Sequence, residues 1–357
     1  EELRELGLAY AIDLVVVDVE LTPAPPRNLE KAFGCDVVDR VALILDIFAQ
    51  HAHSSAGMHQ VELAQLRYRL PRLRGRGVEM SRLGGGIGTR GPGETQLEVD
   101  RRRILRRIAK LERDLVDLAR TRETQRKARR RAALPVVALV GYTNAGKSTL
   151  LNVATAADVH VEDRLFSTLD PTTRRVRFAD GGVALLSDTV GFVKKLPHQV
   201  VEAFRSTLEE VSGADLLVHV ADGSSPDVAR QIAAVRTVLA EIDAAALPEI
   251  IAINKSDIAD PADVAALLRR HEGSVAVSAA TGEGVDELLA AVARRLRAGS
   301  AIVELLVPYD RGEVLAAVHR ESEVLVEAHT AEGTRLQVRL PEPERTRFAE
   351  FAAEVAS

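Results

Sequence analysis

The chain has 357 residues, of which 46% are hydrophobic and 28% charged, and its formal net charge is −5. That length is enough for two or three domains with buried cores. The single cysteine, Cys35, excludes an internal disulfide, and no apolar run approaches the roughly 20 residues of a membrane-spanning helix. We therefore expect a cytoplasmic protein without an integral membrane segment, with peripheral membrane association as an alternative.

The first part of the chain has the pattern of a small α/β domain. Residues 14–17 are typical of a strand, 28–33 of a short helix, 37–38 of a second strand and 41–52 of a helix. We expect this domain to span residues 1–58.

Two helical patterns follow, one from Val61 with Pro71 near its end, and one from about Glu94 to Arg131. Apolar residues on the second helix recur at intervals of four and three, as in a heptad repeat. These residues are Ile104, Ile108, Leu111, Leu115 and Leu118. Such a stripe buries one narrow face against a partner helix, so we expect an antiparallel helical hairpin over residues 59–132.

Most of the positive charge lies on this predicted hairpin. Between Arg67 and Arg131 there are 21 Lys and Arg against 8 Asp and Glu, whereas the rest of the chain is acidic. A basic arm on an acidic body indicates a polyanionic partner. Glycine permits close approach and arginine pairs with phosphates or stacks on bases, so we favour RNA over a merely solvated hairpin. The expected RNA contacts are Arg72, Arg74, Arg76, Gly84, Gly85, Gly86 and Arg90.

The next segment has the strand, glycine loop and helix of a phosphate-binding P-loop. Residues 134–140 form an apolar run, and a helical pattern begins at Thr149. The loop between them matches G-x-x-x-x-G-K-[ST], whose backbone N–H groups bind phosphate together with the helix N-terminus. Its residues are Gly141, Tyr142, Thr143, Asn144, Ala145, Gly146, Lys147 and Ser148.

Two further segments are expected to contact the γ-phosphate and its metal. The D-x-x-G pattern of Asp188, Thr189, Val190 and Gly191 puts the carboxylate near Mg²⁺, often through water, and the glycine N–H on the γ-phosphate. The other segment consists of Phe166, Ser167, Thr168, Leu169 and Asp170. Either Ser167 or Thr168 fits the spacing of a second Mg²⁺ ligand beside Ser148.

The residue after the D-x-x-G pattern is Phe192, where many regulatory GTPases carry a glutamine that orients the attacking water. A phenylalanine side chain neither donates nor accepts a hydrogen bond. We therefore expect slow intrinsic hydrolysis and a partner that supplies or orders the missing group.

A guanine signature follows about a hundred residues after the P-loop. The apolar run 250–253 ends in N-K-x-D: Asn254, Lys255, Ser256 and Asp257. The Asp257 carboxylate can accept from both guanine N1–H and the 2-amino group, which adenine lacks in that arrangement, while the stem of Lys255 covers the base. A backbone N–H of Ser278, Ala279 or Ala280, after the strand 275–277, could meet guanine O6. The nucleotide is therefore expected to be GTP.

The remaining chain has the pattern of a small α/β domain over residues 300–357, after a nucleotide-binding domain over 133–299. Strands are expected at 302–307, 324–326 and 336–338, and a helix at 312–319.

Several segments together resemble the HflX-type GTPases of the Obg-related group. They are RNLE from Arg27, QVELAQL from Gln60, GGGIGTRGPGETQ from Gly84, GYTNAGKST from Gly141, LFSTLDPTTRR from Leu165, DTVGF from Asp188 and FRSTLEEV from Phe204. The resemblance covers nearly the whole chain. It implies an α/β fold: a P-loop GTPase domain with a mixed, mostly parallel sheet and helices on both faces, preceded by the small α/β domain with its basic hairpin and followed by the small C-terminal domain.

The resemblance also implies a function. Members bind the large ribosomal subunit, reach with the hairpin toward ribosomal RNA near the peptidyl-transferase centre, and split or rescue stalled ribosomes. It implies Mg²⁺ at Ser148 and Thr168 rather than Ser167, and ribosome-stimulated hydrolysis of GTP to GDP and phosphate that depends on Lys147 and Thr168. We expect a monomer. The alternative is a membrane-surface or scaffold switch whose basic hairpin meets anionic lipid.

Overall fold

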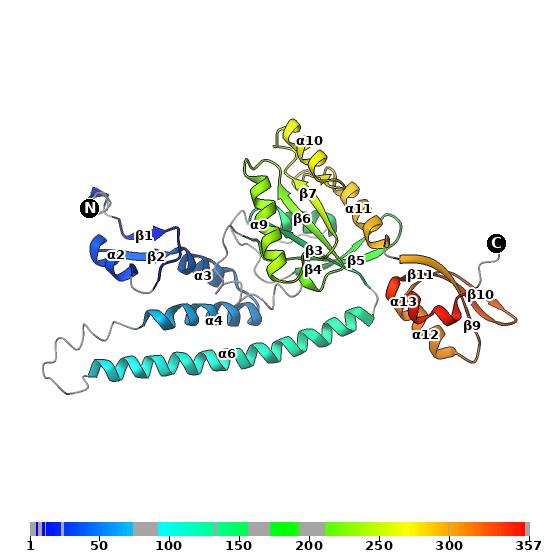
Figure 1. Cartoon of the computed structure of the whole chain (residues 1–357), viewed down its shortest axis with the longest axis horizontal. Coiled ribbons are helices and arrows are strands. Elements are labelled where there is room, and N and C mark those ends of the chain that lie inside the picture. Colours follow the sequence, from blue (N-terminus) through cyan, green and yellow to red (C-terminus); the bar gives the residue numbers. More distant parts are fainter. Residues whose placement is uncertain are drawn as a thin grey trace. The chain divides into compact units, whose positions relative to one another are not determined.

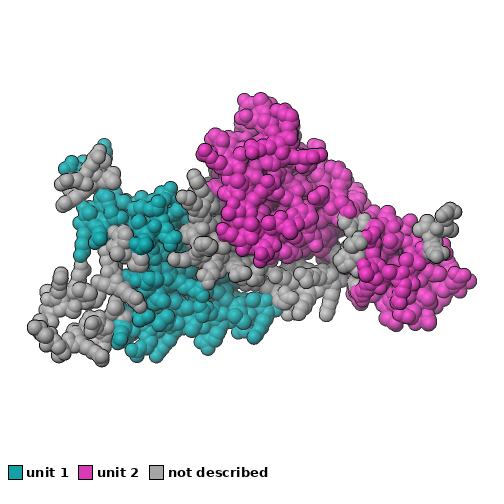
Figure 2. Space-filling view, in the orientation of Figure 1, with its two compact units in different colours: residues 1–120, 164–170, 193–208 teal, residues 121–163, 171–192, 209–357 magenta. Residues whose placement is uncertain are grey.

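The computed structural model describes residues 5, 9–10, 12–22, 25–73, 92–131, 134–155, 172–192, 211–298 and 300–353. The described residues divide between two compact units, one made of those up to Arg120 and the other of those from Thr121 onward (Figure 2). Each unit has its own hydrophobic clusters and is described by itself.

The first unit begins with a two-stranded parallel sheet and three helices. Its elements are β1 (Leu14–Val17), α2 (Pro25–Phe33), β2 (Asp36–Asp39), α3 (Arg40–His51) and α4 (Ser55–Arg72). The four predicted elements of this region are confirmed. However, α4 begins earlier than Val61, because the Ser54 hydroxyl caps it by accepting a hydrogen bond from the Gly57 N–H at 2.9 Å.

The long helix α6 (Pro92–Arg131) lies beside α4 in Figure 1. Leu63 of α4 and Ile108 and Leu111 of α6 form a buried cluster, onto which further leucine and isoleucine side chains of both helices pack. The heptad prediction is confirmed for Ile104, Ile108, Leu111 and Leu115, which belong to this seam. Two ion pairs flank the seam, Arg107 with Glu62 at 2.6 Å and Arg67 with Glu112 at 2.8 Å.

The second unit contains a six-stranded sheet with strand order β4-β5-β3-β6-β7-β8. The strands are β3 (Val136–Gly141), β4 (Thr172–Arg177), β5 (Val183–Asp188), β6 (Leu216–Asp222), β7 (Glu249–Asn254) and β8 (Val275–Ala276). In this sheet only β4 runs antiparallel to its neighbour, and the other five strands are parallel to one another. This mixed, mostly parallel sheet confirms the predicted fold class.

Helices cover both faces of this sheet (Figure 1). They are α7 (Lys147–Thr155), α9 (Val228–Glu241), α10 (Pro261–Arg270) and α11 (Val285–Arg297). Residues of α7 and α11 pack into one hydrophobic core with the sheet, and residues of α9 and α10 pack into a second. The strands are buried on both faces because each face has its own helical layer.

The C-terminal part of the second unit is a three-stranded antiparallel sheet with order β10-β11-β9. Its elements are β9 (Ser300–Val307), α12 (Gly312–Glu321), β10 (Glu323–Thr330), β11 (Gly333–Pro341), α13 (Glu342–Arg347) and the 3₁₀ turn η1 (Ala349–Phe351). The predicted strands and helix are confirmed, and the strands are longer than expected. Across all described residues, no helix combines the length and apolar character needed to cross a membrane.

Candidate functional site

Five parallel strands end at one edge of the six-stranded sheet, and polar loops follow them there. Because the carboxyl ends of parallel strands form the ligand crevice of open α/β sheets, this edge is the candidate site. The P-loop follows β3, the D-x-x-G segment follows β5, and the N-K-x-D segment follows β7.

The backbone of the P-loop requires its two glycines. Gly141 has φ +154°, and a Cβ there would collide with the carbonyl oxygen of Val220 on β6. Gly146 has φ +92°, and a Cβ there would collide with the side-chain nitrogen of Asn254. Asn144 between them also has a positive φ, of 60°. The loop is therefore wrapped closely against β6 and β7, with a backbone that other residues could adopt only at a cost.

Lys147 lies in the first turn of α7 and is buried. Its ammonium donates hydrogen bonds to the carbonyl oxygens of Gly141 at 3.2 Å and Tyr142 at 3.1 Å. Burial lowers the pKa of this ammonium, and the nearby Asp188 carboxylate opposes the shift. These contacts hold the charge of Lys147 inside the loop, where a P-loop lysine meets the β- and γ-phosphates.

The hydroxyl of Ser148 donates a hydrogen bond to Asp188 Oδ2 at 2.6 Å. Hydroxyl and carboxylate oxygens are the hard ligands that Mg²⁺ prefers. The two predicted metal-associated side chains that the structure describes are thus brought together at the P-loop, and they fit magnesium. The segment with Phe166, Ser167, Thr168, Leu169 and Asp170 lies outside the described residues.

The D-x-x-G segment packs directly onto the P-loop. Thr189 Oγ1 donates to the carbonyl of Leu139 at 2.6 Å. At Gly191, a Cβ would lie 2.8 Å from Thr143 Cγ2 and 3.1 Å from Lys147 Nζ, so only glycine fits beside the lysine. The Gly191 backbone therefore lies beside the P-loop lysine, and its predicted contact with a γ-phosphate stays a prediction.

The backbone of Phe192 also contacts the P-loop. Its N–H donates to the carbonyl of Gly141 at 3.1 Å, and its carbonyl accepts from the Thr143 N–H at 2.8 Å. The side chain is buried, with 1% exposed. The position after Gly191 therefore holds an apolar ring within the protein interior, and a glutamine there would have to bury its amide.

Asn254 connects the P-loop to the loop after β8. Its Nδ2 donates to the carbonyl of Ala145 at 2.7 Å, and its Oδ1 accepts from the Ala279 N–H at 2.9 Å. Asn254 is buried, so both hydrogen bonds lie away from water. Among the three N–H groups predicted to meet guanine O6, that of Ala279 is used by Asn254 and that of Ser278 by the Glu283 carbonyl.

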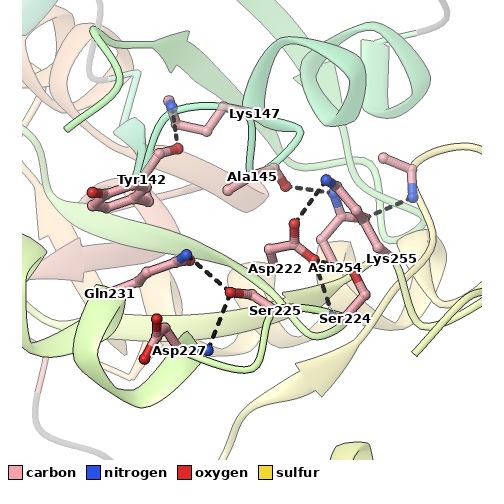
Figure 3. Close-up of polar contacts among 11 residues, drawn as sticks. Tyr142, Ala145, Lys147, Asp222, Ser224, Ser225, Asp227, Gln231, Asn254 and Lys255 are labelled. Carbon is pink, nitrogen blue, oxygen red and sulfur yellow. Dashed lines mark hydrogen bonds and ion pairs between the residues drawn. The ribbon is translucent and has the colours of Figure 1, made fainter. Parts of the chain in front are cut away.

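The other two signature residues of the N-K-x-D segment, Lys255 and Asp257, differ in exposure. Lys255 has φ +62°, and its ammonium pairs with Asp222 Oδ2 at 2.7 Å (Figure 3). Asp257 is exposed, so its carboxylate is accessible to a ligand. Discrimination against adenine by this carboxylate requires that the bound base itself cover it.

Asp222 is a site residue that the sequence reasoning missed. It is the last residue of β6 and lies directly opposite Asn254 in the parallel register. The signal in the sequence was a carboxylate at the end of the mostly apolar run 216–221, one strand away from the N-K-x-D segment. Its significance depended on knowing that β6 and β7 are neighbours.

The structure gives Arg72 a packing role, and its predicted contact with RNA stays a prediction. Its guanidinium donates to the carbonyl of Leu21 at 2.6 Å, pairs with the buried Asp39 at 3.3 Å and stacks on the Tyr68 ring at 3.5 Å. Burial and a hydrogen bond to Asp39 raise the pKa of the Tyr68 hydroxyl. The Arg72 side chain therefore connects the end of α4 to Asp39 at the end of β2 and to Leu21. The other predicted RNA contacts, Arg74, Arg76, Gly84, Gly85, Gly86 and Arg90, lie outside the described residues.

Four protein-family models match the chain in succession. They are GTP-binding GTPase N-terminal over residues 1–49, GTP-binding GTPase Middle Region over 51–129, 50S ribosome-binding GTPase over 136–255 and HflX C-terminal domain over 263–349. The matches follow one another along nearly all of the chain.

Curated relatives agree with these models. The chain is 51% identical to a GTPase HflX of Caldanaerobacter subterraneus subsp. tengcongensis, with 87% of this chain and 72% of that protein covered. It is 44% identical to the GTPase HflX of Escherichia coli K12, with 95% of this chain and 80% of that protein covered. A solved structure of a GTP-binding protein from Sulfolobus solfataricus in complex with GDP is 25% identical, with a TM-score of 0.46 and coverage of 83% and 84%. The chain belongs to the HflX family of GTPases.

Proposed function

We propose that this GTPase binds the large ribosomal subunit through its basic α4–α6 arm, splits or rescues stalled ribosomes, and is reset by GTP hydrolysis. The N-terminal domain (residues 1–58) and the hairpin (59–132) would bind the ribosome. The GTPase domain (133–299) would change conformation with the bound nucleotide, and residues 300–357 would form a separate C-terminal domain. The partner is ribosomal RNA near the peptidyl-transferase centre.

The observation that carries this proposal is the arginine face of α6. A helix turns by about 100° per residue, so Arg102, Arg106 and Arg113 lie on the face opposite Leu111 and the seam. All three are exposed. They span about 17 Å along the helix at 1.5 Å per residue. Because the seam is buried against α4, the arginine face is left for an extended polyanion, and guanidinium groups bind phosphates bidentately.

The nucleotide would bind at the sheet edge, with each segment in a distinct role. The P-loop and Lys147 would hold the phosphates, Gly191 would contact the γ-phosphate, and Asp257 would read guanine. Ala280 is the candidate for guanine O6, since the N–H groups of Ser278 and Ala279 are engaged within the protein. Ser148 and Thr168 would bind Mg²⁺, with Asp188 acting through water.

When bound, Mg²⁺ neutralises the charge that develops between the β- and γ-phosphates. The remaining chemistry is positioning by the chain's own groups. Because Phe192 is apolar and buried, the chain lacks a water-orienting side chain at that position. We propose that the ribosome supplies or orders this group, so that hydrolysis follows productive docking.

Sedimentation with purified large subunits tests the proposal. The protein should pellet with large subunits in a non-hydrolysable GTP analogue and less so in GDP. A triple variant with Arg102, Arg106 and Arg113 changed to Glu should lose this binding, whereas the exposed Arg230→Glu on α9 should keep it. Pelleting with anionic liposomes, without binding to subunits, would instead support the membrane-surface switch.

A further inference from the structure

Asp222 and Lys255 form an ion pair at the nucleotide edge of the sheet. The Lys255 ammonium lies 2.7 Å from Asp222 Oδ2, and the two side chains are 27% and 18% exposed. They come from the ends of the neighbouring strands β6 and β7 (Figure 3). A charged hydrogen bond at this depth is stronger than one on an open surface.

The second oxygen of Asp222 is also fixed. Its Oδ1 accepts from the Ser224 N–H at 3.0 Å and from the Ser224 hydroxyl at 2.6 Å. The next residue, Ser225, accepts from the Asp227 N–H at 3.3 Å and from the side-chain amide of Gln231 at 3.0 Å, which ties the loop to α9. The Asp222 carboxylate is therefore oriented by its own loop as well as by Lys255.

The Lys255 side chain depends more on a partner for its orientation than Asn254 does. Asn254 is locked by two buried hydrogen bonds. Lys255 has a long, rotatable stem on a backbone with φ +62°. Ordering a lysine side chain costs rotamer entropy. A partner that orders it in the free protein removes that cost from nucleotide binding, which is preorganisation.

We propose that Asp222 is a positioning residue for the guanine nucleotide, which holds the Lys255 ammonium so that its stem is aligned to cover the base. Asp222 acts through Lys255 and does not itself touch the nucleotide. The inference deepens the proposed assignment of residues 254–257 to the base, and it rests on that assignment.

The experiment measures dissociation of a fluorescent GDP analogue and steady-state GTP hydrolysis for five variants of the full chain. Asp222→Asn should raise the dissociation rate about tenfold, as expected for loss of one charge-assisted hydrogen bond. The KM for GTP should rise with it, while kcat at saturating GTP stays unchanged. Asp227→Asn is the matched control, because it lies on the same loop but pairs with the exposed Arg230. It should behave as wild type.

Lys255→Ala, which removes both the stem and the ammonium, distinguishes the role of Lys255 from that of Asp222. Lys255→Ala should also speed dissociation, and adding Asp222→Asn to it should have little further effect, because Asp222 acts only through Lys255. If Lys255→Ala leaves dissociation unchanged, the assignment of Lys255 to the base is wrong. If it speeds dissociation but Asp222→Asn does not, or if the two effects multiply, the positioning role of Asp222 is wrong. Circular dichroism of each variant identifies a folding defect, in which case Ser224→Ala should still raise dissociation modestly by loosening the carboxylate.

Discussion

The side-chain amide of Asn254 donates a hydrogen bond to the backbone carbonyl of Ala145 at 2.7 Å, across 109 residues of chain. The same amide accepts from the Ala279 N–H at 2.9 Å. One buried side chain thus joins the P-loop, the N-K-x-D segment and the loop after β8. The geometry of the phosphate site and that of the base site are therefore coupled through Asn254.

Asn254→Ala should lower both stability and nucleotide affinity. The change leaves a buried carbonyl and a buried N–H without their partner, at about 1–3 kcal/mol each. Chemical denaturation should show a GTPase domain less stable by about 2–6 kcal/mol. Gln231→Ala, which removes a hydrogen bond nearer the surface, should cost less than about 1 kcal/mol. Equal stability of the two variants would contradict the coupling role of Asn254.

Gly146→Ala should be far more damaging than Gly181→Ala, although both glycines have a similar backbone. Their φ angles are +92° and +86°. A Cβ at Gly146 would displace the Asn254 amide from its two hydrogen bonds, whereas a Cβ at Gly181 meets nothing within 4 Å. Gly181→Ala should show only backbone strain of about 1–2 kcal/mol. Gly146→Ala should also lose nucleotide binding by more than about tenfold, as measured by titration.

Leu111→Ala should loosen the pairing of α4 and α6. Leu111 is fully buried in the seam, and a Leu→Ala change in a core costs about 2–5 kcal/mol. Leu105 of the same helix is 44% exposed and provides the matched control. Hydrogen–deuterium exchange should accelerate in peptides from both helices of Leu111→Ala and remain unchanged in Leu105→Ala. Unchanged exchange in Leu111→Ala would mean that the seam does not hold the arm together.

Glu249 should contribute to the acid sensitivity of the GTPase domain. Burial disfavours its ionised form, but hydrogen bonds and charges from His219 and Arg236 outweigh this and lower its pKa from 4.5 to about 2. Because the unfolded carboxyl takes up its proton first, this contribution is present above about pH 4.5 and is lost as the pH falls toward 2.

The measurement is the urea midpoint as a function of pH for wild type, Glu249→Gln and the exposed control Glu287→Gln. The wild type should lose stability more steeply than Glu249→Gln below about pH 5.5, and Glu287→Gln should follow the wild type. Parallel curves for wild type and Glu249→Gln would rule out this contribution.

Local patterns predicted most of the fold. The apolar run 134–140 with its glycine loop gave the P-loop, and the heptad stripe around Leu111 gave the seam, because both signals are contiguous in sequence. The early start of α4 was missed because Ser54 acts as a cap that hydrophobic periodicity does not report. The packing of Arg72 on Tyr68 and Asp39 was missed because an arginine in a basic run carries no local sign of a buried partner.

The parts of the candidate site that belong to sequence motifs could be predicted, and the contacts between them could not. The motifs of residues 141–148, 188–191 and 254–257 carry their own spacing, so their proximity followed from a parallel sheet. Asp222 belongs to no motif, and its pairing with Lys255 arises from the strand order β6–β7. Contacts set by topology rather than by spacing are therefore what the sequence left undetermined.

The most direct test of the central claim is a sucrose-gradient profile of intact ribosomes incubated with this protein. With a non-hydrolysable GTP analogue, intact ribosomes should fall, free subunits should rise, and the protein should migrate with the large subunit. With GDP, or with the triple variant at Arg102, Arg106 and Arg113, the profile should match that of ribosomes alone. Unchanged intact ribosomes in the GTP analogue, with no protein on the large subunit, would contradict the account.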